Sequence, residues 1–147
     1  MLAAIRPDSW NLPLFLHVLG ATILFGATAT IAIAGFAERA QTQHAALLAR
    51  IVLRTFLFGV VPSFILMRVG AGLIADKEFP DKTPGWVDVG FLVSEPGAIL
   101  LIIVGTLAWL GSRKQGAGRA AFAVPILASI YLVALGVAWF AMSAKPS

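Results

Sequence analysis

The sequence predicts an all-α integral membrane protein, a bundle of four transmembrane helices with both termini on the extracytoplasmic side. Hydrophobic residues make up 59% of the 147 residues, and charged residues only 12%, about half the charged fraction of a soluble domain. Four apolar runs are each long enough, at about 18 residues or more, to cross a bilayer. Lysine and arginine gather between these runs, as they do in the cytoplasmic loops of membrane proteins.

The first predicted helix covers residues 12–36. At 1.5 Å per residue it spans about 37 Å, which is enough to cross a bilayer with some tilt. This run exceeds the roughly 7–15 residues of a signal-peptide core, so we expect a retained helix. Thr22, Gly26 and Thr30 recur every four residues, and such rows of small side chains let helices approach closely in lipid. They form the predicted packing face, and His17 projects from the opposite side of the helix.

The second predicted helix covers residues 44–75 and carries Arg68 in its interior. Pro62 removes one backbone hydrogen bond and is expected to kink this helix. Residues 76–90 follow as the longest polar segment, whose prolines and glycine indicate irregular structure.

The third predicted helix covers residues 94–111 and the fourth covers residues 120–142. The sequence Ser94-Glu95-Pro96-Gly97 is typical of a helix start, where free backbone amides favour a carboxylate such as that of Glu95. The four helices are expected to form a single transmembrane domain over residues 1–147.

Charge predicts the orientation. The segments after the first and third helices contain five basic residues and one acid, whereas acids outnumber bases on the opposite side. These basic residues are Arg39, Arg50, Arg113, Lys114 and Arg119, and the acid is Glu38. We therefore expect these segments to be cytoplasmic in a multi-pass protein of the cytoplasmic (inner) membrane. The same distribution explains the formal net charge of +4 without nucleic-acid binding.

His17, Arg68 and Glu95 are predicted within about two turns of the outer membrane face. Ionisable groups at this depth usually face a bundle interior, a cavity or one another. An Arg68–Glu95 pair would neutralise both charges, and His17 could hydrogen-bond either of them. We therefore predict an outward-facing polar pocket. Each residue also has a structural interpretation: His17 as a donor in helix packing, Arg68 as a side chain that extends to the headgroups, and Glu95 as a helix-start residue.

Several kinds of chemistry are excluded or weakly supported. The chain has no cysteine, which excludes disulfides and thiolate catalysis. Its histidines and scattered carboxylates show no metal-ligand spacing, so neither a metal site nor catalytic residues are predicted. A transmembrane b-type haem usually takes two axial ligands, but His17 and His44 fall on opposite membrane sides. A haem at His17 would need a second ligand from a methionine such as Met142, or from another chain.

Leu16-His17-Val18-Leu19-Gly20-Ala21, near the start of the first predicted helix, resembles a pattern in bacterial integral membrane proteins of unknown function. It also looks like the first helix of membrane proteins related to the copper-resistance D group, in which such a histidine is a candidate haem or metal ligand. The resemblance covers about the first three helices, including the arginine in the second. It implies mainly a four-helix membrane protein, with His17 as the residue that would hold a haem.

The expected function is that of a small non-catalytic subunit embedded in the lipid bilayer. We expect an accessory or structural role, in which the row Thr22, Gly26 and Thr30 packs into a homo-oligomer or a larger membrane complex. The first alternative is a b-type haem-binding electron-transfer module that uses His17. The second is a proton-coupled transporter of a small solute, built on His17, Arg68 and Glu95.

Overall fold

The computed structural model describes residues 8–78, 85–113 and 118–144, and these are helical almost throughout, with no strand among them. Four helices are long and apolar enough to cross a membrane, so the predicted class of an all-helical protein with four candidate spans is confirmed. The candidate spans are Asn11–Ala40, Thr42–Lys77, Val87–Arg113 and Phe122–Ala144.

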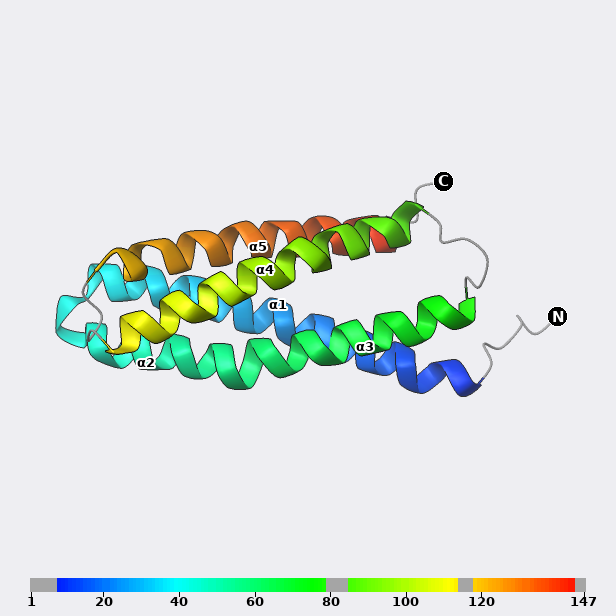
Figure 1. Ribbon diagram of the computed structural model, residues 1–147, viewed down its shortest axis with the longest axis horizontal. Helices are drawn as coiled ribbons and strands as arrows, with labels where there is room; N and C mark the ends of the chain where they lie inside the picture. The colour runs from blue at the N-terminus through cyan, green and yellow to red at the C-terminus, as the bar shows by residue number, and fades with distance from the viewer. Residues whose placement is uncertain (1–7, 79–84, 114–117, 145–147) are drawn as a thin grey trace.

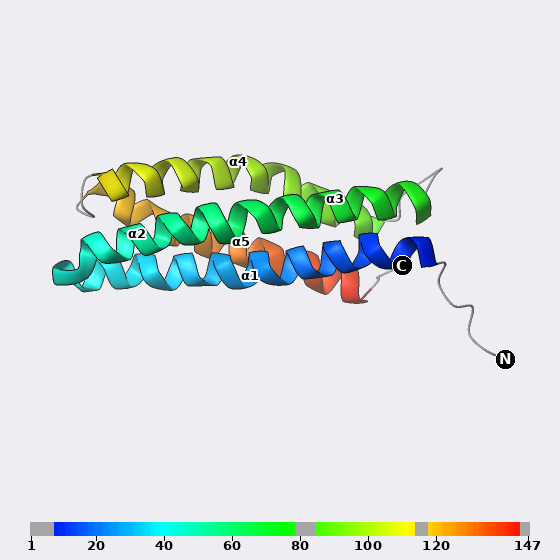
Figure 2. The same ribbon diagram turned by 90° about the horizontal axis from the view of Figure 1, so that it is seen from below.

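The second candidate span is built from four consecutive helical segments, whereas each of the other three is essentially one helix. The spans lie alongside one another as an elongated bundle (Figures 1 and 2). The elements in chain order are η1 (Asp8–Trp10), α1 (Asn11–Ala40), η2 (Thr42–His44), α2 (Ala45–Thr55), η3 (Phe56–Val60), α3 (Val61–Glu78), α4 (Gly85–Arg113) and α5 (Arg119–Ala144).

Helix α1 is central to the bundle, because it packs along α2, α3 and α5, while α4 packs along α5 and touches α2. Helices α3 and α4 pack little against each other, and they diverge toward the end of the bundle where α1 begins and α5 ends (Figure 1). We call this end the wide end and the opposite one the narrow end.

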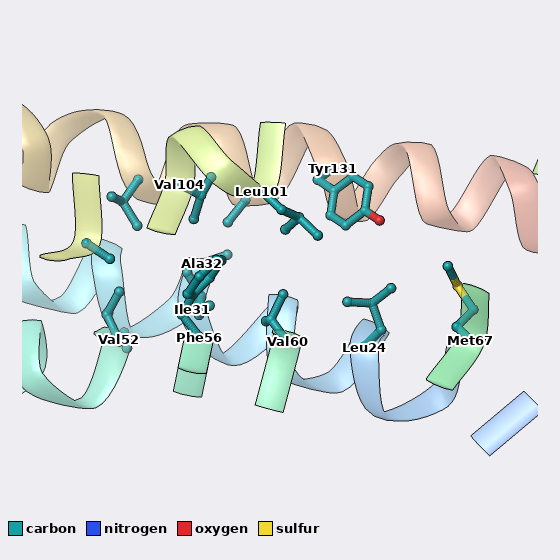
Figure 3. Packing of buried hydrophobic residues seen from close by; sticks show 14 residues of the cluster. Leu24, Ile31, Ala32, Val52, Phe56, Val60, Met67, Leu101, Val104 and Tyr131 are labelled. Carbon is teal, nitrogen blue, oxygen red and sulfur yellow. The ribbon is translucent and has the colours of Figure 1, made fainter. Parts of the chain in front are cut away.

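One face of α1 builds the core. Leu24, Thr28, Ile31 and Gly35 follow one another at three- or four-residue spacing and are all buried. Leu24 and Ile31 belong to a cluster that contains buried side chains of every other span (Figure 3). These partners include Val52, Phe56, Val60, Met67, Leu101, Val104 and Tyr131.

Two glycines let α1 and α3 cross at backbone contact. A Cβ atom at Gly70 would lie 2.5 Å from the His17 backbone nitrogen, and one at Gly20 would lie 2.8 Å from the Ser63 carbonyl oxygen. Neither space can hold a methyl group, so this crossing requires glycine on both helices. The crossing fixes where His17 and Arg68 stand relative to each other.

The irregularity expected at Pro62 takes the form of a π-helical segment, Phe56–Val60, directly before it. Proline has no amide hydrogen and its ring would collide with the carbonyl four residues earlier, and a widened turn relieves this conflict. The Ser63 hydroxyl shares its hydrogen between the carbonyls of Gly59 and Val60, at 2.6 and 3.0 Å, so this buried polar side chain is bonded within its own helix.

The predicted start of the third helix is wrong. Helix α4 begins at Gly85, nine residues before Ser94, and it continues through Pro96. Helix α3 likewise extends to Glu78, so much of the segment 76–90 expected to be irregular is helical, and residues 79–84 lie outside the described chain. Glu95 therefore lies more than two turns inside α4 and not at a helix start, because the apolar run before it continues the helix. The other predicted boundaries agree within about four residues.

Candidate functional site

A pocket of about 420 Å³ lies at the wide end, between α1, α3, α4 and α5. It extends along α1 from Leu14 to Phe25, a length of about 16 Å at 1.5 Å per residue. Most of its lining is apolar, and Phe25 meets Trp139 of α5 edge to face with ring centroids 5.9 Å apart. The polar lining residues are His17, Thr22, Arg68, Ser94, Trp139 and Ser143.

His17 connects the pocket wall to α3. Its Nδ1 atom lies 3.0 Å from the carbonyl oxygen of Met67. Because a carbonyl can only accept, Nδ1 carries the hydrogen and donates it. This leaves Nε2 as the ring atom able to accept a hydrogen bond or bind a ligand. The expectation that His17 would bond Arg68 or Glu95 is not met, because its described bond goes to the α3 backbone.

Arg68 reaches from α3 across to α4. Its Nη2 atom lies 3.4 Å from Glu95 Oε1, and its guanidinium carbon lies 4.7 Å above the ring centroid of Phe91. The ion pair is longer than the 2.7–2.9 Å typical of a charge-assisted hydrogen bond. The Glu95 side chain is 70% exposed, against 34% for Arg68. The predicted pairing is therefore present in a loose form, and it bridges the two helices that diverge.

The structure brings together two of the three residues predicted for the polar pocket. His17 and Arg68 line it, whereas Glu95 is absent from its described lining and holds Arg68 from one side. The result is a predominantly apolar pocket with one cation and one imidazole, and not a cluster of three interacting ionisable groups.

The predicted packing row of α1 is exposed. The hydroxyls of Thr22 and Thr30 donate to Val18 and Gly26 carbonyls of their own helix at 2.8 and 2.9 Å. A Cβ atom at Gly26 would meet no described atom within 4 Å. Close packing inside the described chain therefore uses the other face of α1, and this row stays exposed, with Thr22 also at the edge of the pocket.

Sequence reasoning missed the burial of Glu38 at the narrow end. It assigned this acid to a loop, but Glu38 lies in α1, is 6% exposed, and its Oε1 has no hydrogen-bond partner in the described chain. The signal was present in the sequence, because Glu38 follows Gly35 by three residues and Ile31 by seven, on the face of α1 that is buried.

A metal site is not supported. No group of three or more His, Cys, Asp or Glu side chains that could hold a metal ion occurs among the described residues. His44 is exposed in η2 at the narrow end, more than 20 residues of helix away from His17, so these two histidines cannot ligate one group.

Comparison with protein-family models, curated proteins and solved structures finds no match. The resemblance of residues 16–21 to copper-resistance D-like proteins therefore stays a prediction, and the function has to be argued from the pocket and the helix surfaces.

Proposed function

We propose that this protein is a non-catalytic integral membrane protein that binds a small, largely apolar molecule in the pocket at the wide end. The observation that carries the proposal is the pocket itself. Its volume of about 420 Å³ falls within the roughly 300–1,000 Å³ of small-molecule sites, which are typically apolar with a few convergent polar groups. Arg68 and His17 supply such groups from two helices held at backbone contact.

The proposal places the wide end on the extracytoplasmic side of the inner membrane. The charge distribution of the connecting segments favours a cytoplasmic narrow end. At the narrow end Arg39 and Arg113 lie over aromatic rings, with guanidinium carbons 3.7 Å from the Phe122 centroid and 4.0 Å from the Trp109 centroid, an arrangement that suits either interface. Arginine and aromatic side chains are both typical of a membrane–water interface.

Filling the pocket should abolish binding. Ala71→Phe adds a ring to the pocket lining, whereas Leu73→Phe adds one on the exposed side of the same helix. In native mass spectra of protein released from mild detergent, we expect a small molecule bound to the natural sequence and to Leu73→Phe, and at least tenfold less bound to Ala71→Phe. Equal occupancy in both variants would contradict the proposal.

Assembly through α1 is the second candidate, because Thr22, Gly26 and Thr30 are exposed and a Cβ atom at Gly26 would meet no described atom within 4 Å. Small residues on a lipid-facing surface permit close approach of another helix. In this role the protein is an accessory subunit of a homo-oligomer or of a larger membrane complex.

Gly26→Leu should dissociate such an assembly, because the leucine separates the two backbones by several ångströms. Gly72→Leu is the matched control, since a Cβ at Gly72 also meets no described atom within 4 Å but lies outside the row. Light scattering in mild detergent should show a smaller particle for Gly26→Leu only. An unchanged particle mass would remove this candidate.

A haem-binding module is the alternative that His17 favours. Donation from Nδ1 to a backbone carbonyl is how ligating histidines are commonly held, with Nε2 left for the iron. The described residues fit a haem incompletely, because they place no second histidine at this depth. Met67 and Met142 line the same pocket, so one of these methionines would have to supply a second ligand from this chain.

The absorption spectrum of protein purified from its native membrane distinguishes haem from other ligands. Binding of a colourless apolar molecule gives no Soret band, and this is the result we expect. A Soret band that disappears in His17→Ala but persists in His44→Ala would establish the haem alternative instead.

The transporter alternative has less geometric support. It was built on His17, Arg68 and Glu95 acting together, but Glu95 is outside the described pocket lining and His17 bonds the Met67 carbonyl.

A further inference from the structure

We propose that the pocket binds an anionic single-chain amphiphile, whose carboxylate or phosphate headgroup contacts Arg68 and whose chain enters from the bilayer between α3 and α4. This inference rests on the proposed ligand-binding function and specifies the chemical class of its ligand.

The charge of the pocket selects an anion. Arg68 is the charged residue among the described lining side chains, and the rest of the lining is apolar or neutral polar, apart from the titratable His17. A guanidinium has five N–H donors in a plane that matches a carboxylate or a phosphate. Within the described residues Arg68 makes one hydrogen bond, at 3.4 Å, to a carboxylate that is itself 70% exposed. The remaining donors are therefore unused by this bond and can take an anionic headgroup.

The length of the pocket favours a ligand that has an alkyl chain. It runs about 16 Å along α1, and apolar side chains line it on both sides of Arg68 in that direction, from Leu14 at the wide end to Phe25 at the depth of the core. A small inorganic anion would leave this apolar length unfilled. An alkyl chain entering from the bilayer would fill it and would contact the apolar side chains along its length.

The path into the pocket lies between α3 and α4. These helices both line the pocket but pack little against each other, and they diverge toward the wide end (Figure 1). The contacts that bridge them there come from Arg68, to Glu95 and to the Phe91 ring. Val69 and Leu92, which follow Arg68 and Phe91 in the sequence, are 50% and 71% exposed, so both helices carry apolar side chains on their surfaces beside the ion pair.

In this arrangement the Glu95 carboxylate and the ligand's headgroup compete for the Arg68 guanidinium. When an anion arrives, it replaces Glu95 at the guanidinium, and the exposed carboxylate turns away toward the surface. The loose, exposed ion pair is the arrangement that such an exchange needs, because a short, buried pair would cost several kilocalories per mole to open.

The test uses the full chain in detergent and two probes with the same chain, 9,10-dibromostearate and its methyl ester. Bromine quenches tryptophan on contact, and Trp139 lines the pocket. We expect saturable quenching by the anionic probe, lost in Trp139→Phe. Arg68→Gln should weaken its binding about tenfold, as expected for loss of a charge-assisted contact, and should leave the ester unchanged. Inorganic phosphate up to millimolar concentration should not compete, because it lacks the chain.

Glu95→Gln keeps the test decisive if Arg68→Gln does not fold, because position 95 is exposed. Removing the competing carboxylate should tighten dibromostearate binding about two- to fivefold. Equal affinity for acid and ester, unaffected by either substitution, would overturn the inference while leaving an apolar-ligand pocket in place. Quenching that survives Trp139→Phe would place the probe outside the pocket and overturn it too. If Ala71→Phe bound as much of the small molecule as the natural sequence does, that result would instead contradict the proposed function itself.

Discussion

Gly70→Ala should lower the free energy of unfolding by about 1–3 kcal/mol, the range found for overpacked cores. The added methyl group would lie 2.5 Å from the His17 backbone nitrogen and 2.7 Å from the Pro13 carbonyl oxygen. Both obstacles are backbone atoms of α1, which cannot move aside as a flexible side chain can. The two helices would have to separate, and the His17–Met67 hydrogen bond would be strained with them.

The matched control is Gly72→Ala on the same helix. A Cβ at Gly72 meets no described atom within 4 Å, so this substitution should be neutral or stabilise by about 0.5–1 kcal/mol through helix propensity. Denaturant unfolding in mixed micelles, followed by circular dichroism, measures both. Equal stability of the two variants would show that α1 and α3 do not cross at backbone contact.

The four spans were predictable because a long apolar run in the sequence is enough to indicate a membrane-spanning helix. The start of α4 was not, because proline is compatible with two local structures. At Pro96 the sequence suits a first helical turn, but helix α4 passes through it, and one missing hydrogen bond is tolerated inside a transmembrane bundle. The apolar run Val89–Val93 directly upstream of Ser94 was the better signal, because it favours a longer helix over a loop.

The candidate site was predictable in part. Opposite charges at one depth indicate a pair, and Arg68 and Glu95 do approach each other. The orientation of α1 was not predictable in the same way, since a small-residue row and the His17 face can both pack closely. In the structure the face of α1 that carries Gly20 packs against α3 at Gly70, and Gly26 is left exposed. Only the tertiary contacts contain that information.

Glu38→Met should raise the free energy of unfolding by about 1–3 kcal/mol, the cost of a buried polar group that lacks a partner. Glu38 is 6% exposed and its Oε1 makes no hydrogen bond in the described chain. Its surroundings at the narrow end are apolar side chains, including Val52, Leu107 and Val124. Methionine is unbranched like glutamate, so it can follow the same path while removing both oxygens.

Two companion variants separate burial from charge. Glu38→Gln removes the charge but keeps polar atoms in the same place, so its gain should be smaller than that of methionine. Glu95→Met removes a carboxylate that is 70% exposed, and should change stability by less than about 1 kcal/mol. Denaturant unfolding in mixed micelles gives the free energy of unfolding of all three variants. If Glu38→Met were instead destabilising, the carboxyl would have to make a stabilising interaction with a group outside the described residues, and the prediction would be wrong.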